Sequence, residues 1–180
     1  PVHDQRLDYV RMAFEYAHDL LGRRLDIVDL GANMGMVAFF CGAAPQVRSV
    51  VGLEADPRYV EAAKVLAFYN DSPQSVVFEE YMTGNRPYTW NTDVLLMLSV
   101  YHHVADKDAF LQELAAKKIT CIIGEFAVQE RYYPQRGSVE AEIAHIKKTL
   151  GFKYVECLAV SQDYQRPLVV FHNGPQSIRK

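Results

Sequence analysis

The chain has 180 residues and a mass of 20.5 kDa, which is the usual size of one folded domain. Hydrophobic residues make up 49% and charged residues 23%, a balance that excludes a disordered or fibrous protein. The formal net charge of −3 excludes the basic excess of nucleic-acid-binding domains, and no apolar run reaches the roughly 18 residues of a membrane span. We therefore expect a single domain over residues 1–180, with no nucleic-acid partner and no transmembrane segment. The sequence leaves open whether this domain belongs to a longer chain.

The first half of the chain alternates helical and extended segments. Helices are expected at residues 5–21, 34–41 and 57–69, and strands at residues 25–30, 47–53 and 75–78. Gly22 ends the first helix, and Pro57 begins the third at a position where its missing N–H costs nothing. This alternation is typical of parallel strands connected by helices.

The second half continues the alternation and then changes at its end. Strands are expected at residues 93–98, 119–126, 152–160 and 168–172, helices at residues 106–118 and 138–150, and a loop at residues 83–91. The last two strands must be antiparallel, because the short loop between them cannot hold a parallel crossover. We predict a Rossmann-like, doubly wound seven-stranded sheet, mostly parallel with a C-terminal antiparallel hairpin. This succession of strands and helices along the chain is typical of class I methyltransferases.

Cysteine usage points to a reducing compartment. Cys41, Cys121 and Cys157 are far apart, and each has apolar neighbours. This pattern matches neither a disulfide framework nor a C-x-x-C metal site. We therefore expect three buried, reduced thiols and a cytoplasmic protein.

A glycine loop, Gly31-Ala32-Asn33-Met34-Gly35, follows the first predicted strand and opens the next helix. Glycines there allow a tight turn and let a ligand approach the backbone. Asn33 stands where methyltransferases often have a glycine, and asparagine tolerates a positive φ. Asp29, at the end of the strand, fits the acid that meets the ammonium group of S-adenosylmethionine in those enzymes. The alternative is a plain strand-to-helix turn.

Acidic residues also follow the second and third strands. Glu54, followed by Ala55, comes directly after the second strand, where a carboxylate can accept hydrogen bonds from both hydroxyls of a ribose. Glu80 and Tyr81 follow the third strand, in the region where adenine is normally held. Together with the glycine loop, Glu54 favours S-adenosylmethionine as the cofactor. NAD stays an alternative, although the G-x-N-x-G spacing differs from its usual G-x-G-x-x-G.

The fourth strand leads into Ser99-Val100-Tyr101-His102-His103. Ligands bind outside the carboxyl ends of the strands in open α/β sheets, so Ser99 and Val100 are candidate cofactor contacts and the histidines candidate catalytic residues. We prefer His102, which could take a proton from a hydroxyl acceptor or orient a phosphate acceptor. The alternative for at least one histidine is a structural role. We expect no metal site, because adjacent residues on a strand face opposite ways. The other histidines are expected on the surface or in helix packing: His3, His18, His145 and His172.

Several segments together resemble a known family, the methyltransferase domain of the bacterial bifunctional kinase–methyltransferases that terminate O-antigen polysaccharide chains. The resemblance covers nearly the whole chain and is carried by Gln5-Arg6-Leu7-Asp8, Leu21-Gly22-Arg23, Asp29-Leu30-Gly31, Leu98-Ser99-Val100-Tyr101-His102-His103, Glu125-Phe126-Ala127-Val128-Gln129-Glu130 and Arg166-Pro167-Leu168. It implies S-adenosylmethionine as cofactor and a methyl acceptor at the end of a glycan, on phosphate or sugar. It also implies that Arg6 contacts the cofactor's carboxylate and that Glu125 and Arg131 lie near the acceptor.

We therefore expect an O-methyltransferase that acts on a glycan end or glycan phosphate in surface polysaccharide biosynthesis. No kinase domain follows in this chain, so another saccharide or a small metabolite stays open as the acceptor. Two further alternatives are a methyltransferase of small natural products and a cofactor-binding module without catalysis. A partner domain or a homo-oligomer also stays open.

Overall fold

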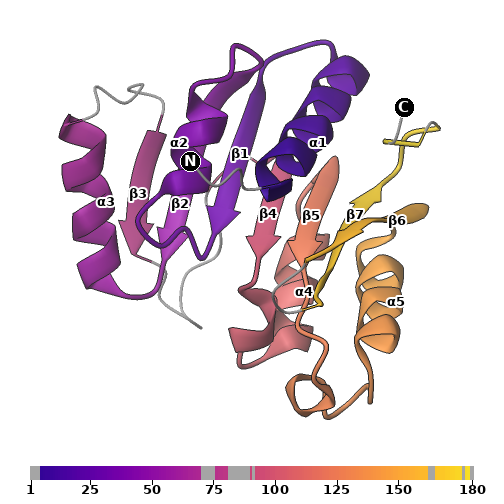
Figure 1. The fold of residues 1–180 in the computed structure, drawn as a ribbon. Coiled ribbons are helices and arrows are strands. Elements are labelled where there is room, and N and C mark those ends of the chain that lie inside the picture. Colours follow the sequence, from indigo (N-terminus) through magenta and orange to yellow (C-terminus); the bar gives the residue numbers. More distant parts are fainter. Residues whose placement is uncertain are drawn as a thin grey trace.

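The computed structural model describes residues 5–69, 76–80, 90, 92–161, 165–175 and 177–178. Its α-helices are α1 (Gln5–Leu21), α2 (Met36–Gly42), α3 (Pro57–Tyr69), α4 (Lys107–Ala115) and α5 (Val139–Leu150). Its strands are β1 (Leu25–Leu30), β2 (Val47–Glu54), β3 (Val76–Glu80), β4 (Val94–Leu98), β5 (Cys121–Glu125), β6 (Tyr154–Val160) and β7 (Pro167–His172). Two short 3-10 turns, η1 (Tyr101–His103) and η2 (Glu130–Tyr132), follow β4 and β5 (Figure 1).

The strands form one seven-stranded sheet in the order β3-β2-β1-β4-β5-β7-β6. Strands β1 to β5 are parallel to one another, and β7 runs antiparallel to both of its neighbours, β5 and β6. The predicted mostly parallel sheet with a C-terminal antiparallel hairpin is confirmed. The order reverses between β1 and β4, which is the point where open α/β sheets bind ligands.

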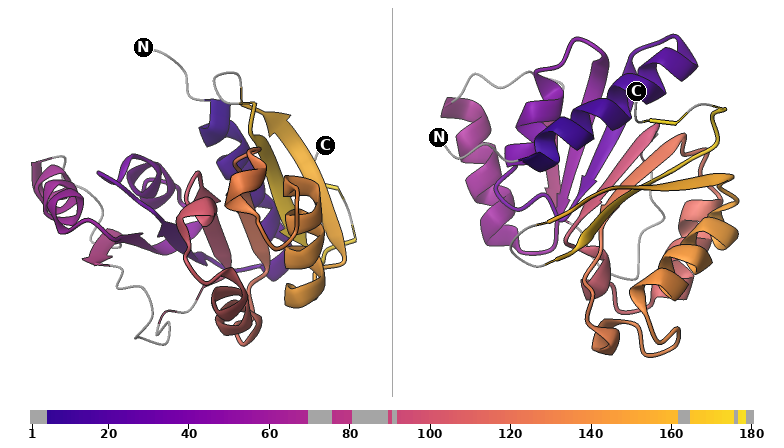
Figure 2. Two further views of the ribbon diagram at one scale, coloured as in Figure 1. Left: turned by 90° about the horizontal axis from the view of Figure 1, so that it is seen from below. Right: turned by 45° about the vertical axis from the view of Figure 1, so that its right-hand side comes forward.

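Helices cover both faces of this sheet (Figure 2), and a hydrophobic layer lies between each set of helices and the sheet. Helices α1, α2 and α3 pack on one face, where Phe14 and Ala38 meet sheet residues such as Ile27. Helices α4 and α5 pack on the other face, where Leu111 and Ile146 meet residues such as Leu95. Because both faces are covered, the central strands β1 and β5 are buried along their whole length, as expected for parallel strands between two layers of helices.

Most predicted element boundaries agree with the structure to within two or three residues. Helix α5 begins as expected, because the Ser138 hydroxyl accepts a hydrogen bond from the Ala141 N–H at 3.2 Å. It ends at Gly151, whose φ of 71° gives the left-handed cap. Helix α4 ends at Ala115, three residues earlier than predicted, because its last turn is followed by a bend that leads into β5. The predicted loop at 83–91 lies outside the described residues apart from Trp90.

The cysteine prediction is partly wrong. Cys41 and Cys121 are buried, but Cys157 is exposed. Cys157 lies on β6, which is an edge strand and has solvent on one side. Of the other histidines, His172 packs against α1 as expected, with its Nδ1 3.0 Å from the Tyr16 hydroxyl, and His3 lies outside the described residues.

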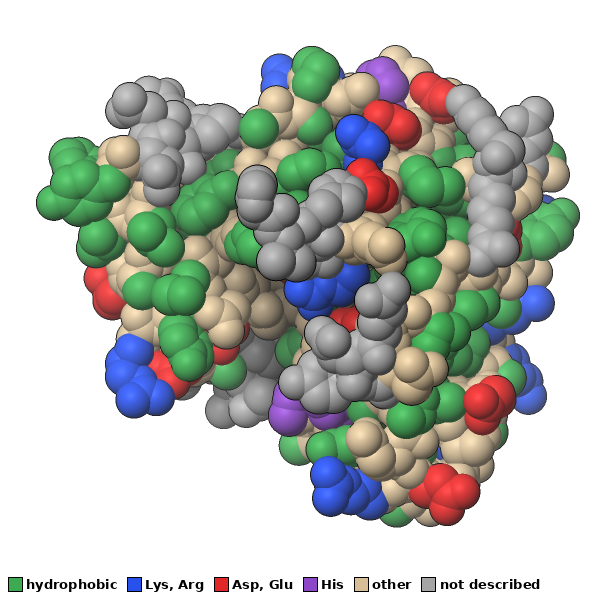
Figure 3. Space-filling model, viewed as in Figure 1, with side chains coloured by type: hydrophobic (Ala, Val, Ile, Leu, Met, Phe, Trp, Pro, Cys, Tyr) green, Lys and Arg blue, Asp and Glu red, His purple; other side chains and the backbone are tan. Residues whose placement is uncertain are grey.

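Exposed hydrophobic side chains gather on the outer face of α3, at the left of Figure 3. Phe68 and Tyr69 are 80% and 78% exposed, and Val65 and Leu66 continue the patch. Apolar surface of this kind is where a partner domain or a second copy would dock, but the partner itself stays a prediction. Among the described helices, none has the length and apolar character to cross a membrane.

Candidate functional site

The glycine loop makes a tight turn between β1 and α2. Gly31, Asn33 and Gly35 have positive φ values of 75°, 50° and 89°. The N–H groups of Gly31 and Ala32 donate hydrogen bonds to the Leu53 carbonyl, at 2.8 and 3.0 Å. The expected left-handed conformation of Asn33 is therefore confirmed, and the loop is held against the end of β2.

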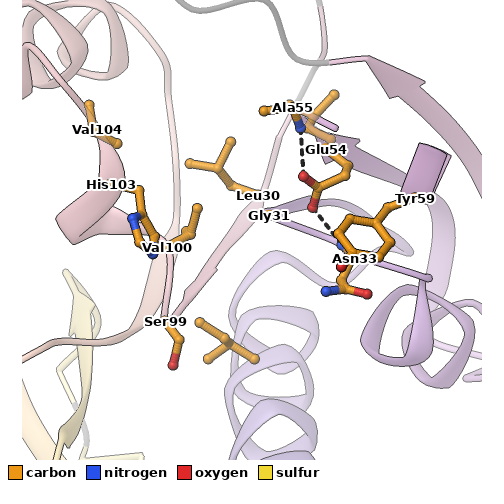
Figure 4. A pocket seen from close by; sticks show the side chains of 12 residues that line it. Leu30, Gly31, Asn33, Glu54, Ala55, Tyr59, Ser99, Val100, His103 and Val104 are labelled. Carbon is orange, nitrogen blue, oxygen red and sulfur yellow. Dashed lines mark hydrogen bonds between the residues drawn. The ribbon is translucent and has the colours of Figure 1, made fainter. Parts of the chain in front are cut away.

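Glu54 ties this loop to the segment after β2. Its Oε2 accepts a hydrogen bond from the Asn33 N–H at 2.8 Å, and its Oε1 accepts from the Ala55 N–H at 2.8 Å (Figure 4). The Asp56 N–H adds a third hydrogen bond to Oε1, at 3.0 Å. Backbone donors thus orient the carboxylate before any ligand binds.

A pocket of about 360 Å³ lies at the carboxyl ends of β1, β2 and β4, and we call it the strand-end pocket. It lies where the strand order reverses, between β1 and β4. Of the predicted residues, seven line it: Gly31, Asn33, Glu54, Ala55, Ser99, Val100 and His103 (Figure 4). Its wall also contains five residues that the sequence analysis missed: Leu30, Leu53, Tyr59, Leu98 and Val104. Leu30, Leu53 and Leu98 lie at ordinary ends of buried strands, and Val104 directly follows η1. Tyr59 had one usable signal, an aromatic side chain soon after the acidic strand end.

Asp29 lies beneath the glycine loop rather than on the wall of this pocket. It is 3% exposed, and its Oδ2 has no hydrogen-bond partner among the described residues. Burial, and secondarily the negative charge of Glu54, raise the pKa of Asp29 to about 7. A buried carboxylate with an unpartnered oxygen is unusual, and it gives this end of β1 an unused acceptor.

Five other predicted residues do not line the pocket either: Ala32, Gly35, Glu80, Arg6 and His102. Gly35 is packed against Phe78: a Cβ on Gly35 would come within 2.4 Å of the Phe78 Cζ, so this glycine makes room for a ring. Ala32 is buried in the hydrophobic layer that contains α2. Glu80 is exposed at the end of β3, and Tyr81 lies outside the described residues.

Both histidines lie in η1, not on the strand itself. His103 is exposed and lines the pocket, whereas His102 is 8% exposed and packs edge-on against Tyr132, with ring centroids 4.8 Å apart. Nδ1 of His102 has no hydrogen-bond partner among the described residues. Burial, and then the nearby His103 and Arg166, lower the pKa of His102 to about 4, so it is neutral near pH 7.

The premise that the histidines face opposite ways on a strand is wrong. In the 3-10 turn their rings lie side by side, with centroids 4.1 Å apart. Within the described part of the chain, no group of three or more His, Cys, Asp or Glu residues could hold a metal ion.

Arg6, Ser99 and Glu125 meet where β4 and β5 end. The Ser99 hydroxyl donates a hydrogen bond to Oε2 of Glu125, and Arg6 Nη1 lies 3.6 Å from the same oxygen. Ser99 has a φ of 58°, a left-handed conformation that non-glycine residues adopt rarely and that is enriched at functional sites. The cluster brings the N-terminus of α1 to the edge of the sheet that carries the pocket.

Three solved structures illustrate what this chain is similar to. The bifunctional kinase-methyltransferase WbdD superposes with a TM-score of 0.76 at 19% identity, over 96% of this chain and 40% of that chain. The methyltransferase domain of bacterial CtHen1 gives 0.68 at 15% identity, over 93% of this chain and 97% of that one. YcgJ from Bacillus subtilis gives 0.60 at 13% identity, over 89% and 96%.

These likenesses establish the fold. The chain has the class I S-adenosylmethionine-dependent methyltransferase fold, and the resemblance to the methyltransferase domain of a kinase–methyltransferase is confirmed at that level. The chain spans about two fifths of the length of the WbdD chain. No model of a known protein family matches the sequence, and no curated protein does.

Proposed function

We propose that this chain is an S-adenosylmethionine-dependent O-methyltransferase. The observation that carries the proposal is the strand-end pocket itself, which opens at the reversal of strand order between the glycine loop and Glu54. Its volume of about 360 Å³ is within the range of small-molecule sites.

The residues around the pocket fit this cofactor. Oε2 of Glu54 accepts one backbone N–H and keeps a second lone pair for a ribose hydroxyl. The unpartnered Oδ2 of Asp29 offers an acceptor to the ammonium group, from beneath the glycine loop. Arg6, at the edge of the site and 38% exposed, supplies a guanidinium for the carboxylate of the methionine part. Gly31, Ala32, Asn33, Gly35 and Ala55 would shape the turn around the ligand, and Glu80 and Tyr81 stay the predicted adenine contacts.

The cofactor would supply a methyl group on a sulfonium, and its transfer requires an aligned acceptor and little water. His103 lines the pocket and can accept a proton from a hydroxyl acceptor or orient a phosphate. His102, kept neutral by burial, would hold the turn in place against Tyr132 and present an unpartnered nitrogen. The structural context thus favours His103 for direct contact with the acceptor and leaves His102 as the second candidate.

For the acceptor we propose a glycan end or a glycan phosphate, in surface polysaccharide biosynthesis. Two observations support it: the resemblance of the Ser99–His103 segment to the O-antigen chain-terminating enzymes, and the structural likeness to the kinase-methyltransferase WbdD. The buried thiols of Cys41 and Cys121 are compatible with the reducing cytoplasm.

Calorimetric titration with S-adenosylmethionine, with NAD as the control ligand, tests the proposal. We expect S-adenosylmethionine to bind and NAD not to bind. Glu54→Gln should weaken binding roughly 10- to 100-fold, because it replaces the charged carboxylate that would accept hydrogen bonds from the ribose hydroxyls with a neutral amide. The matched control is Glu113→Gln, an exposed glutamate on α4 away from the pocket, which should leave the affinity unchanged.

Failure of folded wild-type protein to bind S-adenosylmethionine would contradict the proposed function. Binding that Glu54→Gln leaves unchanged would contradict the role of Glu54 alone.

A further inference from the structure

We call η1 (Tyr101–His103) the histidine turn. On its other side from the strand-end pocket lies a pocket of about 330 Å³, here called the second pocket. The segment from Ala105 to Asp108 and the segment that contains Tyr132 and Arg136 form its wall, with Glu142 of α5. None of the residues assigned to the cofactor lines it.

The histidine turn separates the two pockets. Val104 lines the strand-end pocket and the next residue, Ala105, lines the second pocket. Tyr132 lines the second pocket, and its ring also packs against His102. A molecule in the second pocket would therefore contact Tyr132, the residue that packs against His102, without entering the cofactor's space.

Charges of both signs line the second pocket. Asp106, Asp108 and Glu142 contribute three carboxylates, and Lys107 and Arg136 contribute two cations. Arg136 pairs with Asp108 at 2.6 Å, and the Lys107 ammonium donates a hydrogen bond to the Val104 carbonyl at 3.0 Å. Because the two signs are interspersed, a ligand of either charge would meet like charges beside opposite ones, and the wall offers no surplus of cations to an anion.

Buried polar groups in this wall have unused hydrogen-bonding capacity. The Tyr133 hydroxyl is buried near the Ala127 N–H, but no described group meets it at hydrogen-bonding geometry. Nε of Arg136 is likewise buried without a hydrogen-bond partner among the described residues. Glu142 is 2% exposed and accepts a hydrogen bond from the Tyr101 hydroxyl through one of its two oxygens. Proteins rarely leave such groups unsatisfied. With Lys107 and the carboxylates of Asp106 and Asp108, the wall contains both donors and acceptors, so it suits a ligand that both donates and accepts.

We infer that the second pocket binds a neutral polyhydroxylated ligand, a sugar ring or a polyol. Hydroxyl groups can donate to the carboxylates and accept from Arg136 and Lys107 at the same time. The ring of Tyr132 offers an aromatic surface for the apolar face of a sugar ring. The ligand class follows from the wall of the pocket. Its use as a subsite for the part of the acceptor next to the methylated group rests on the proposed function.

Ligand-observed NMR on the full chain tests the inference, with methyl glucoside, methyl galactoside and methyl mannoside as neutral probes. Glucose 6-phosphate and glucosamine serve as charged counterparts. At least one neutral glycoside should bind with a Kd on the order of 1–10 mM, and the charged sugars should bind more weakly.

Ala105→Trp places a large side chain in the wall of the second pocket and should weaken glycoside binding about tenfold or more. Ala105 is exposed, so the substitution leaves the core unchanged. The matched control is Ala115→Trp, another exposed alanine, at the end of α4 and away from both pockets, which should leave glycoside binding unchanged.

Three results would overturn the inference: no neutral glycoside binds at tens of millimolar, a charged sugar binds better, or Ala105→Trp leaves binding unchanged. Titration of the same samples with S-adenosylmethionine separates the two proposals. Glycoside binding without cofactor binding would leave the second pocket standing and refute the proposed methyltransferase. Cofactor binding without glycoside binding would refute the inference about the second pocket and leave the proposed methyltransferase standing.

Discussion

Two glycines with positive φ show how different causes can require the same residue. Gly31 faces Val100, and a Cβ at Gly31 would come within 2.7 Å of the Val100 Cγ2. Gly137 has a similar φ, 82°, but nothing lies within 4 Å of its Cβ position. Gly31 therefore serves both the backbone turn and close packing, whereas Gly137 serves only the turn.

Alanine at these two positions should separate the effects. Gly137→Ala should lower the free energy of unfolding by roughly 1–2 kcal/mol, which is the cost of a left-handed conformation for an L side chain. Gly31→Ala should cost about 1–3 kcal/mol more, because the new methyl group overpacks against Val100. Urea unfolding of both variants measures the difference. Equal losses would mean that Val100 moves aside without cost.

The buried carboxylate of Asp29 should make stability depend on pH. Its pKa is about 7 in the folded chain, against an ordinary value of 3.8. Between these two values the folded state holds the proton more tightly than the unfolded state, so stability from this group falls as pH rises from about 4 to 7. Above pH 7 the folded chain bears the full cost of the buried charge.

Asp29→Asn should remove this dependence. The free energy of unfolding of the wild type minus that of Asp29→Asn should fall between pH 5 and pH 7 and level off by about pH 8. Denaturant unfolding at a series of pH values gives this difference, in which the contributions of other titrating groups cancel. A difference that is flat, or that rises with pH, would show that Asp29 is ionised below pH 5.

At the scale of elements, one buried hydrogen bond connects the histidine turn to α5. The Tyr101 hydroxyl donates to Oε1 of Glu142 at 2.6 Å, and both side chains are buried. Tyr101 also packs edge-on against Phe126, at the end of β5. The position of the turn that carries His103 therefore depends on α5, which lies far along the chain.

Tyr101→Phe should lower the free energy of unfolding by about 1–3 kcal/mol, because it keeps the ring but leaves a buried carboxylate oxygen without its donor. Tyr69→Phe, at a position that is 78% exposed, is the control and should change stability by less than about 0.5 kcal/mol. Urea unfolding compares the two variants. If Tyr101→Phe were as stable as the wild type, the hydrogen bond between Tyr101 and Glu142 would make no net contribution to stability.

At the scale of the whole molecule, burial decreases from the middle of the sheet to its edges. Every residue of β1 and of β5 is buried, whereas β3 buries only Phe78 and β6 only Leu158. The strand-end pocket lies at the centre of this gradient, between β1 and β4. A rigid centre would hold the glycine loop and the end of β4 in fixed relative positions.

Hydrogen exchange should follow the same gradient. Amides of β1, β4 and β5 should exchange most slowly, and those of β3 and β6 fastest among the strands, because edge strands open without disrupting the core. Exchange measured by mass spectrometry on peptides from each strand tests this order. Protection of β3 equal to that of β1 would indicate that another part of the molecule or a second copy covers this edge.

Local signals in the sequence determined most of the elements and part of the lining of the strand-end pocket. Apolar periodicity located the helices and strands, and the short connection before β7 required an antiparallel pair. The glycine loop and Glu54 were also readable, because backbone conformation and the ends of adjacent parallel strands depend on nearby residues. For the same reason Asn33 was correctly expected to have a positive φ.

Only the tertiary structure decided features that depend on residues far apart in the chain. The insertion of β7 between β5 and β6, the pairing of Tyr101 with Glu142, and the meeting of Arg6 with Glu125 all join distant segments. Which histidine lines the strand-end pocket was equally undetermined, because the answer depends on a 3-10 turn and on Tyr132. Periodicity reports which face of an element is buried, but the partner on that face is set by how the elements pack together.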